Sequence, residues 1–76
     1  MPKISVIHYK KLVKFFQYNG FALDRQTGDH LVFTKNGIKR PVIIPAYKEV
    51  PIFIIKENLK TAEISREDYL KYFRIT

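Results

Sequence analysis

Residues 25–40, RQTGDHLVFTKNGIKR, predict β-strands joined by two turns. Gly28 marks a tight turn. Asn36-Gly37 lies between two apolar-rich runs and is the strongest short-range signal for a hairpin, because both turn residues must tolerate positive φ. His30 follows the first turn, and the same ribbon carries the cations Arg25, Lys35, Lys39 and Arg40. A histidine within a ring of cations indicates an acid–base group that faces a phosphate.

Three strands are predicted, over residues 21–26, 31–35 and 39–44. The first alternates apolar and polar residues and is therefore expected to be half-buried. The unbroken apolar run Val42-Ile43-Ile44 indicates that the third strand is covered on both faces at its end. Pro41 cannot donate a ladder hydrogen bond, which favours an edge position or a bulge. The short turns between the strands predict an antiparallel sheet.

Helices are predicted before and after these strands in the sequence, and we expect them to pack on one face of the sheet. Apolar residues recur at helical spacing over about residues 8–19 and 51–61. Asn19-Gly20 can end the first helix in the left-handed conformation, and Pro51 suits the first turn of the second. Ser65 can cap a short final helix. The sequence therefore predicts one α+β domain over residues 1–76, with a helix, a three-stranded antiparallel sheet, a helix and a short extra C-terminal helix.

The composition excludes several classes of protein. The 76-residue chain has no cysteine and two histidines, so we expect neither a disulfide framework nor a thiolate or multi-histidine metal site, and no cofactor. No apolar run approaches the roughly 18 residues of a membrane span. The first residues lack the apolar core of a signal peptide, so we expect a cytoplasmic protein.

Positive charge is concentrated in the N-terminal two-thirds of the chain. The formal net charge is +7. Residues 1–48 hold nine basic and two acidic side chains, whereas residues 49–76 hold five of each. A one-sided excess of this kind is typical of proteins that bind a polyanion, most often nucleic acid. A soluble, Lys-rich surface without such a partner is the alternative.

His30 is the histidine best placed for catalysis. RNA cleavage needs a base for the 2′-OH proton, an acid for the leaving 5′ oxygen and cations that stabilise the phosphorane, and an imidazole can serve as both acid and base. A surface histidine without a role is the alternative. Asp29 could favour the protonated imidazole or only cap the Gly28 turn. His8 is expected at the surface where the first helix begins, and Tyr47 could stack on a base.

Several motifs of the chain resemble, in their order and spacing, those of the HicA toxins, the small ribonuclease partners in HicA–HicB toxin–antitoxin modules. The resemblance runs over nearly the whole length. It rests on Pro2-Lys3-Ile4, Gly20-Phe21, Arg25-Gln26-Thr27-Gly28-Asp29-His30, Val42-Ile43-Ile44-Pro45, and Ile64-Ser65 before Glu67-Asp68-Tyr69-Leu70.

The resemblance implies a double-stranded-RNA-binding-domain-like fold, α-β-β-β-α, in agreement with the predicted order of elements. It implies the toxin of a type II module, a metal-independent endoribonuclease that cleaves messenger RNA with the histidine of a glycine–X–histidine motif, here Gly28 and His30. It also implies a HicB-type antitoxin that covers this site. The alternative is a non-catalytic module that binds double-stranded RNA or a protein, including a degenerate toxin that binds only its antitoxin.

The chain departs from the family pattern near this motif. The family commonly has serine where Asp29 stands, and a carboxylate there repels an approaching phosphate. Many members carry a histidine after the strand-ending proline, where this chain has Ala46-Tyr47. The segment from Pro45 to the next helix is shorter than usual, and Phe53 stands where glycine is common.

We therefore predict His30 as the general acid–base of a site that cleaves RNA without a metal. The residues predicted to bind RNA are Gly28, which shapes the turn, and the cations Arg25, Lys35, Lys39, Arg40, Lys10 and Lys14. For the last two, a solvated helix face is the alternative. The predicted partners are messenger RNA and a HicB-like antitoxin, with no membrane. The oligomeric state is open, a free monomer being one option.

Overall fold

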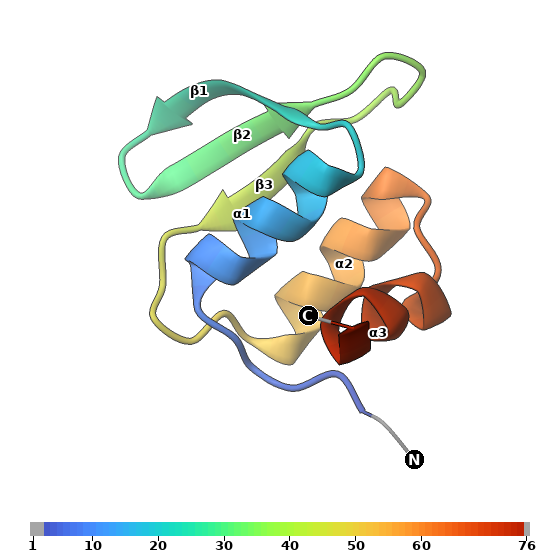
Figure 1. Cartoon of the computed structure of the whole chain (residues 1–76). Coiled ribbons are helices and arrows are strands. Elements are labelled where there is room, and N and C mark those ends of the chain that lie inside the picture. Colours follow the sequence, from blue (N-terminus) through green and yellow to red (C-terminus); the bar gives the residue numbers. More distant parts are fainter. Residues whose placement is uncertain (1–2, 76) are drawn as a thin grey trace.

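The computed structural model describes residues 3–75, so Pro2 of the resembling motifs lies outside the described residues. The elements are α1 (Tyr9–Tyr18), β1 (Ala22–Thr27), β2 (His30–Thr34), β3 (Val42–Pro45), α2 (Ile52–Ala62) and α3 (Arg66–Ile75). The strands form one antiparallel sheet in the order β1-β2-β3 (Figure 1). This arrangement confirms the predicted α+β class and the α-β-β-β-α order with an extra C-terminal helix.

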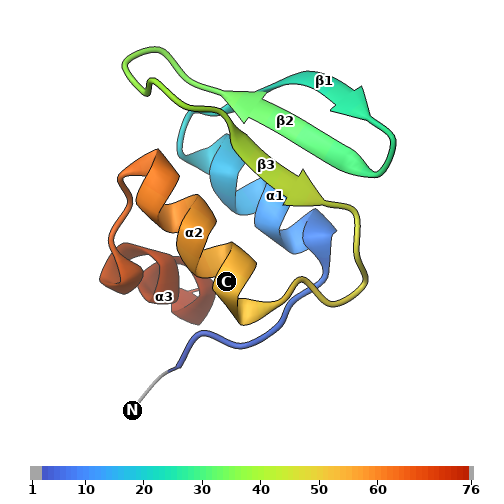
Figure 2. The same cartoon turned by 180° about the vertical axis from the view of Figure 1, so that it is seen from behind.

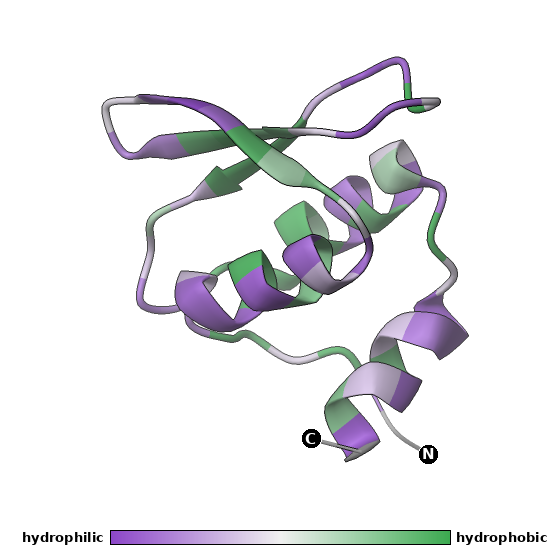
Figure 3. Ribbon diagram, turned by 45° about the horizontal axis from the view of Figure 1, so that its top comes forward, coloured by the Kyte–Doolittle hydropathy of each residue, from purple (hydrophilic) through white to green (hydrophobic). Residues whose placement is uncertain are grey.

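The elements stack in three layers. α1 and α2 lie against one face of the sheet, and α3 lies on the far side of these helices from the strands (Figures 1 and 3). The other face of the sheet is not covered by any described element (Figure 2). The fully buried side chains between the layers are Leu12, Phe15, Phe16, Phe33, Val42, Ile44, Val50 and Ile55. α3 packs on α1 through Tyr69, Tyr72 and Phe73, whose ring centroids lie 5.0, 5.1 and 5.8 Å from that of Phe15.

The two faces of the sheet differ in burial. Val42 and Ile44 of β3 are fully buried and oppose Phe33 and Leu31 of β2, so these residues face the helices. Ile43 lies between them and is 44% exposed on the outer face. The expectation that the third strand is covered on both faces is therefore wrong, because no described element packs on the outer side.

β1 is an edge strand, and all six of its residues are exposed. The expectation of a half-buried strand is therefore wrong. α1 and α2 pack against β3, at the opposite edge of the sheet, and β1 extends beyond them. Phe21, just before the strand, is the buried residue of this segment, with its ring 5.5 Å from that of Phe16.

The connection between β2 and β3 is longer than predicted. Asn36-Gly37 does form a turn, in which the Ile38 N–H donates to the Lys35 carbonyl at 3.1 Å. Gly37 has φ 93°, but Asn36 does not share a positive φ, so the two-residue hairpin turn does not form. The third strand accordingly begins at Val42 and not at residue 39. β3 lies at the edge of the sheet, as expected from Pro41 just before it, which cannot donate a ladder hydrogen bond.

The helix ends agree with most of the capping signals. His8 is the N-cap of α1, where Nδ1 accepts a hydrogen bond from the Lys10 N–H at 3.2 Å, so this half-buried histidine has a structural role. α2 follows Pro51, and its C-cap Glu63 has a left-handed φ of 59°. Ser65 Oγ accepts from the Asp68 N–H at 3.0 Å, which confirms the predicted cap of α3.

Candidate active site

The turn between β1 and β2 holds His30 at the end of the hairpin. Thr27 pairs with His30, so Gly28 and Asp29 form a two-residue loop. Gly28 has φ 61°, as a type II′ turn requires at its first position, and a Cβ there would meet no heavy atom within 4 Å. The glycine is therefore needed for backbone conformation and not for space. Gln26 Nε2 donates to the Gly28 carbonyl at 3.0 Å across the turn.

The imidazole of His30 is accessible to a substrate. The side chain is 52% exposed, and Nδ1 lies 3.5 Å from Oδ1 of Asp29, whose side chain is 66% exposed. A carboxylate beside Nδ1 favours the tautomer that carries its proton on Nδ1. Nε2 is then the ring nitrogen that can take a proton from a substrate and return it.

A β-bulge determines which β1 side chain accompanies His30. The register shifts after Leu23, so Asp24 is an extra residue and Arg25 opposes Val32. Opposed residues share a face of the sheet, so Arg25 lies on the outer face with His30. The two are diagonal neighbours, with Cα atoms roughly 7–8 Å apart. Strict alternation without the bulge would place Arg25 on the helix side instead.

The sequence pattern did not predict this bulge, although the turn contains a signal for it. A Gly-X loop of two residues fixes Thr27 opposite His30, and Leu23 and Phe33 are the apolar residues that must share the inner face. Between these two pairs, β1 has one residue more than β2. Counting the residues of both strands from the turn to this apolar pair therefore shows that β1 has one extra residue, which must be bulged.

The Arg25 guanidinium forms an ion pair with its neighbour, the bulged Asp24. The side chains are 63% and 46% exposed. Exposed pairs of this kind contribute little free energy, about 0–1 kcal/mol. A phosphate can therefore compete with Asp24 for the guanidinium.

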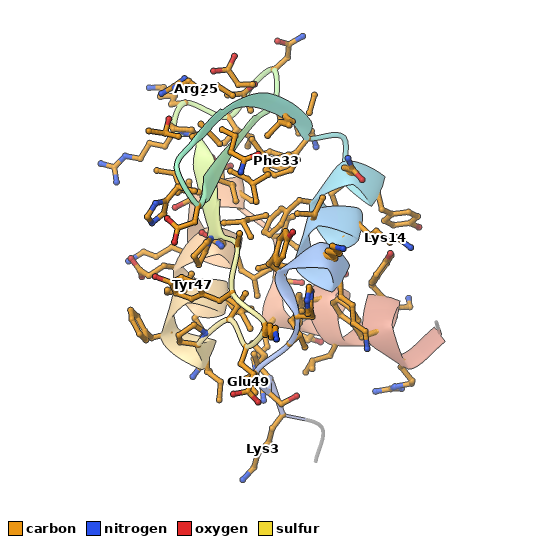
Figure 4. The ribbon with its side chains drawn as sticks, turned by 90° about the vertical axis from the view of Figure 1, so that its left-hand side faces the viewer. Lys3, Lys14, Arg25, Phe33, Tyr47 and Glu49 are labelled. Atoms are coloured by element: carbon orange, nitrogen blue, oxygen red, sulfur yellow. The ribbon has the colours of Figure 1, made fainter. Side chains whose placement is uncertain are left out.

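β3 and the start of α1 border the turn on its other side. His30 opposes the last residue of β3, and the Asp29 carbonyl accepts from the Ala46 N–H at 2.7 Å. The Tyr47 carbonyl in turn accepts from the N–H of Tyr9, the first residue of α1, at 3.1 Å. Tyr47 is 41% exposed and lies below the hairpin in Figure 4. These contacts bring the first turn of α1 close to the candidate site.

Three of the predicted phosphate contacts lie at the opposite end of the sheet from His30. β2 ends at Thr34, so Lys35 is roughly 17 Å along the strand from His30 at about 3.3 Å per residue. Lys35 Nζ lies 5.7 Å from the centroid of the Phe21 ring. Lys39 and Arg40 follow in the β2–β3 loop. The expected ring of cations is therefore wrong, and of its four members Arg25 is the one beside His30.

The remaining predicted cations lie on two further surfaces. Lys39 and Arg40 line an open hollow in which Glu57 and Glu63 partly offset their charge, together with Gly37, Lys60 and Thr61. Lys10 and Lys14 are exposed on α1, and Figure 4 shows Lys14 and Arg25 on different sides of the molecule. Lys10 is in the first helical turn and is the one nearer to the hairpin end.

Within residues 3–75, no group of three or more His, Cys, Asp or Glu side chains could hold a metal ion. Nor does any helix there combine the length and the apolar character needed to cross a membrane.

In comparison with known proteins, a family model described as HicA toxin of bacterial toxin-antitoxin matches residues 9–64. This region runs from the first residue of α1 past the end of α2 and includes the β1–β2 turn, whereas α3 lies beyond it. Neither a curated protein nor a solved structure matches the chain. Because the match covers most of the 76 residues, the chain belongs to the HicA family, the toxins of bacterial toxin–antitoxin systems, each of which has a cognate antitoxin.

Proposed function

We propose that this toxin is an endoribonuclease that cleaves messenger RNA in the cytoplasm, with His30 as its general acid–base and without a metal. The observation that carries the proposal is the exposed imidazole of His30 on the Gly28-Asp29 turn, which is the glycine–X–histidine motif of the family resemblance. The turn lies at the edge of the uncovered sheet face, so an extended RNA strand can reach it.

The chemistry follows from the position of one imidazole. Neutral Nε2 takes the proton from the 2′-OH, and the 2′ oxygen attacks the adjacent phosphorus. The bond from phosphorus to the 5′ oxygen breaks, and the imidazolium returns its proton to that oxygen. The products are a 2′,3′-cyclic phosphate and a 5′-OH end. No protein-bound metal is needed for any of these steps.

Arg25 is the cation best placed to stabilise the phosphorane. It shares the outer face with His30 and has a side chain long enough to bridge the diagonal separation. A guanidinium can donate two parallel hydrogen bonds to phosphate oxygens. To do so, Arg25 exchanges the Asp24 carboxylate for the phosphate. Gly28 contributes by holding the turn, and the antitoxin is expected to silence the toxin by covering this end of the hairpin.

The test replaces each histidine in turn. His30→Ala should reduce RNA cleavage by roughly 10²–10⁴-fold, since a general acid–base contributes about that much, while RNA affinity and folding are retained. His8→Asn is the matched control, because asparagine preserves the N-cap that His8 supplies to α1. Cleavage at the parental rate by His30→Ala would reject the assignment and favour the non-catalytic RNA- or protein-binding module.

The reaction mechanism is tested separately, by the substrate that it requires and by the ends of its products. A deoxyribose at the scissile position should block cleavage, because the attacking 2′-OH is absent. A chelator should have no effect, and the products should carry cyclic or 3′-phosphate ends. Products with 3′-OH ends would show that a different mechanism operates.

A further inference from the structure

A second surface with the character of a nucleic-acid site lies between α1 and α3. An open hollow there is lined by Lys11 and Lys14 of α1 and by Tyr72 and Phe73 of α3. Among the residues that the structure describes, no carboxylate belongs to this lining, in contrast to the mixed charges of the hollow beside Lys39. Tyr18, the last residue of α1, borders the same aromatic group.

The aromatic rings form a supported platform. The Tyr18 ring lies 5.1 Å from that of Tyr72, with the ring planes 49° apart, and the Tyr18 side chain is 75% exposed. Tyr72 is held from below, since its ring meets Phe15 edge-on at 5.1 Å and Phe73 at 4.9 Å. Phe15 itself is 1% exposed. The exposed ring of Tyr18 therefore rests on a supported group of rings and can stack on another planar group on its solvent side.

Two lysines of α1 lie on the same side of the helix as this aromatic platform. Lys11, Lys14 and Tyr18 are spaced by three and four residues, which places them on one side of α1. Proteins that bind single-stranded nucleic acid commonly combine positively charged side chains with an exposed aromatic ring, as Lys11, Lys14 and Tyr18 do here. Cations contact successive phosphates, and bases stack on the rings. A base inside a duplex has no free face to offer, so the geometry favours a single strand.

We propose that Lys11, Lys14 and Tyr18, with Tyr72 supporting the Tyr18 ring, form a second RNA-binding surface, at which unpaired RNA flanking the cleaved bond stacks on Tyr18. This inference rests on the proposed ribonuclease function for its ligand. The surface is separate from the sheet face, because α3 lies on the far side of α1 and α2 from the strands (Figure 3). The start of α1 borders the His30 turn, and the helix spans about 15 Å, so a strand that leaves the turn can follow α1 to Tyr18.

The experiment measures the affinity of single-stranded oligouridine for the His30→Ala protein, which binds RNA without cutting it. Tyr18→Leu should weaken binding by roughly five-fold or more, the effect of losing one stacked base, whereas Tyr18→Phe keeps the ring and should retain affinity. Because Tyr18 is exposed, neither change should disturb folding. Phe53→Ala is the control for an exposed ring elsewhere, since Phe53 is 68% exposed on α2.

The lysines are tested by charge. Lys11→Gln with Lys14→Gln should lower affinity and flatten its dependence on salt, by roughly 0.7 in slope for each lost contact. Lys3→Gln with Lys56→Gln removes the same charge elsewhere and should have a smaller effect. Equal effects from the two pairs, or equal binding by the Tyr18→Leu and parent proteins, would overturn the inference while leaving His30 catalysis intact.

The remaining outcomes separate the two proposals. If the His30→Ala protein binds no oligouridine while the parent protein cleaves RNA, the second surface is rejected and the proposed ribonuclease function stands. If Tyr18→Leu weakens binding of duplex RNA as much as that of oligouridine, stacking of unpaired bases is excluded. If it instead abolishes binding of polyglutamate and leaves RNA binding unchanged, the surface serves an acidic protein segment and the inference is wrong.

Discussion

At the scale of single residues, Asp29 has two opposed effects on the chemistry of His30. Its carboxylate lies 3.5 Å from Nδ1 and can orient the imidazole with Nε2 toward the substrate, but the same charge repels the phosphate that must approach the ring. Both side chains are more than half exposed, so solvent screens the two effects. Repulsion at about 6 Å in water corresponds to roughly three-fold in binding.

We predict that Asp29→Ser improves the KM for RNA by roughly three-fold at low salt, because it removes this repulsion, and that the gain disappears at high salt. Asp29→Asn should behave in the same way, since it also removes the charge. Steady-state cleavage kinetics over a salt series measure both variants. A KM that rises in both variants would mean that the carboxylate assists catalysis more than it repels the substrate.

Tyr69 gives a prediction that concerns stability. Burial raises the pKa of Tyr69 to about 12 from 10.0. The folded state therefore holds this proton more tightly than the unfolded state, and the corresponding stability is present below pH 10 and is lost as the pH rises from 10 to 12. The Tyr69 hydroxyl also has no hydrogen-bond partner among residues 3–75.

Tyr69→Phe should therefore be neutral or stabilising by about 1 kcal/mol near neutral pH, because it removes a buried hydroxyl without a partner. It should also reduce the loss of stability between pH 10 and 12. Urea unfolding of both proteins across this range measures the difference. Tyr18→Phe is the control, since the Tyr18 side chain is exposed. A destabilised Tyr69→Phe protein would indicate that the hydroxyl has a partner after all.

At the scale of elements, the β1–β2 hairpin combines a glycine turn with a bulge, and both determine the face on which its side chains lie. Deletion of Asp24 removes the extra residue and should leave Leu23 opposite Phe33 and Arg25 opposite Val32, as in the parent. Arg25 then keeps its place beside His30 and loses its carboxylate partner.

We predict that the Asp24 deletion retains or improves RNA cleavage, whereas deletion of Gln26 reduces cleavage at least about ten-fold, because it moves Arg25 to the inner face. The two deletions form a pair, since every residue of β1 is exposed, and thermal unfolding reports the additional loss of the Gln26 hydrogen bond to the Gly28 carbonyl. Single-turnover cleavage together with thermal unfolding tests them. Equal activity of the two deletions would show that Arg25 has no catalytic role.

The elements themselves were largely predictable from local pattern. The apolar stripe of α1, Pro51 before α2 and the Ser65 cap of α3 all act within a few residues of the chain, and each agrees with the structure. The errors concern β1 and the start of β3. Burial of β1 depends on where the helices lie, and the β2–β3 loop depends on strand pairing, and neither is determined by adjacent residues.

At the scale of the whole molecule, folding divides the positive charge that the sequence concentrates in residues 1–48. Arg25 lies beside His30, while Lys35, Lys39 and Arg40 lie at the far end of the sheet. The lysines of α1 form a third group. The turn that carries His30 was predictable from the sequence, because its signal is local, but the division of the cations follows from strand length and pairing.

This division predicts that the contribution of the loop cations depends on the length of the RNA. An RNA that contacts only the His30 turn cannot reach the β2–β3 loop, roughly 17 Å along β2. Lys39→Gln with Arg40→Gln should therefore leave the cleavage of a short oligonucleotide unchanged. For an RNA long enough to span the sheet, the same variant should weaken binding and flatten the salt dependence by roughly 0.7 in slope for each lost contact.

The control is Lys56→Gln with Lys71→Gln, which removes the same charge from the C-terminal part of the chain, where acidic and basic side chains balance. If net charge alone attracted the RNA, both pairs would weaken the long RNA equally, because a uniform field does not depend on position. If the loop pair weakened the short and long RNAs alike, the RNA would have to cross the sheet by a different path. A loss confined to the loop pair and to the long RNA requires that the strand lies along the hairpin from His30 to the β2–β3 loop.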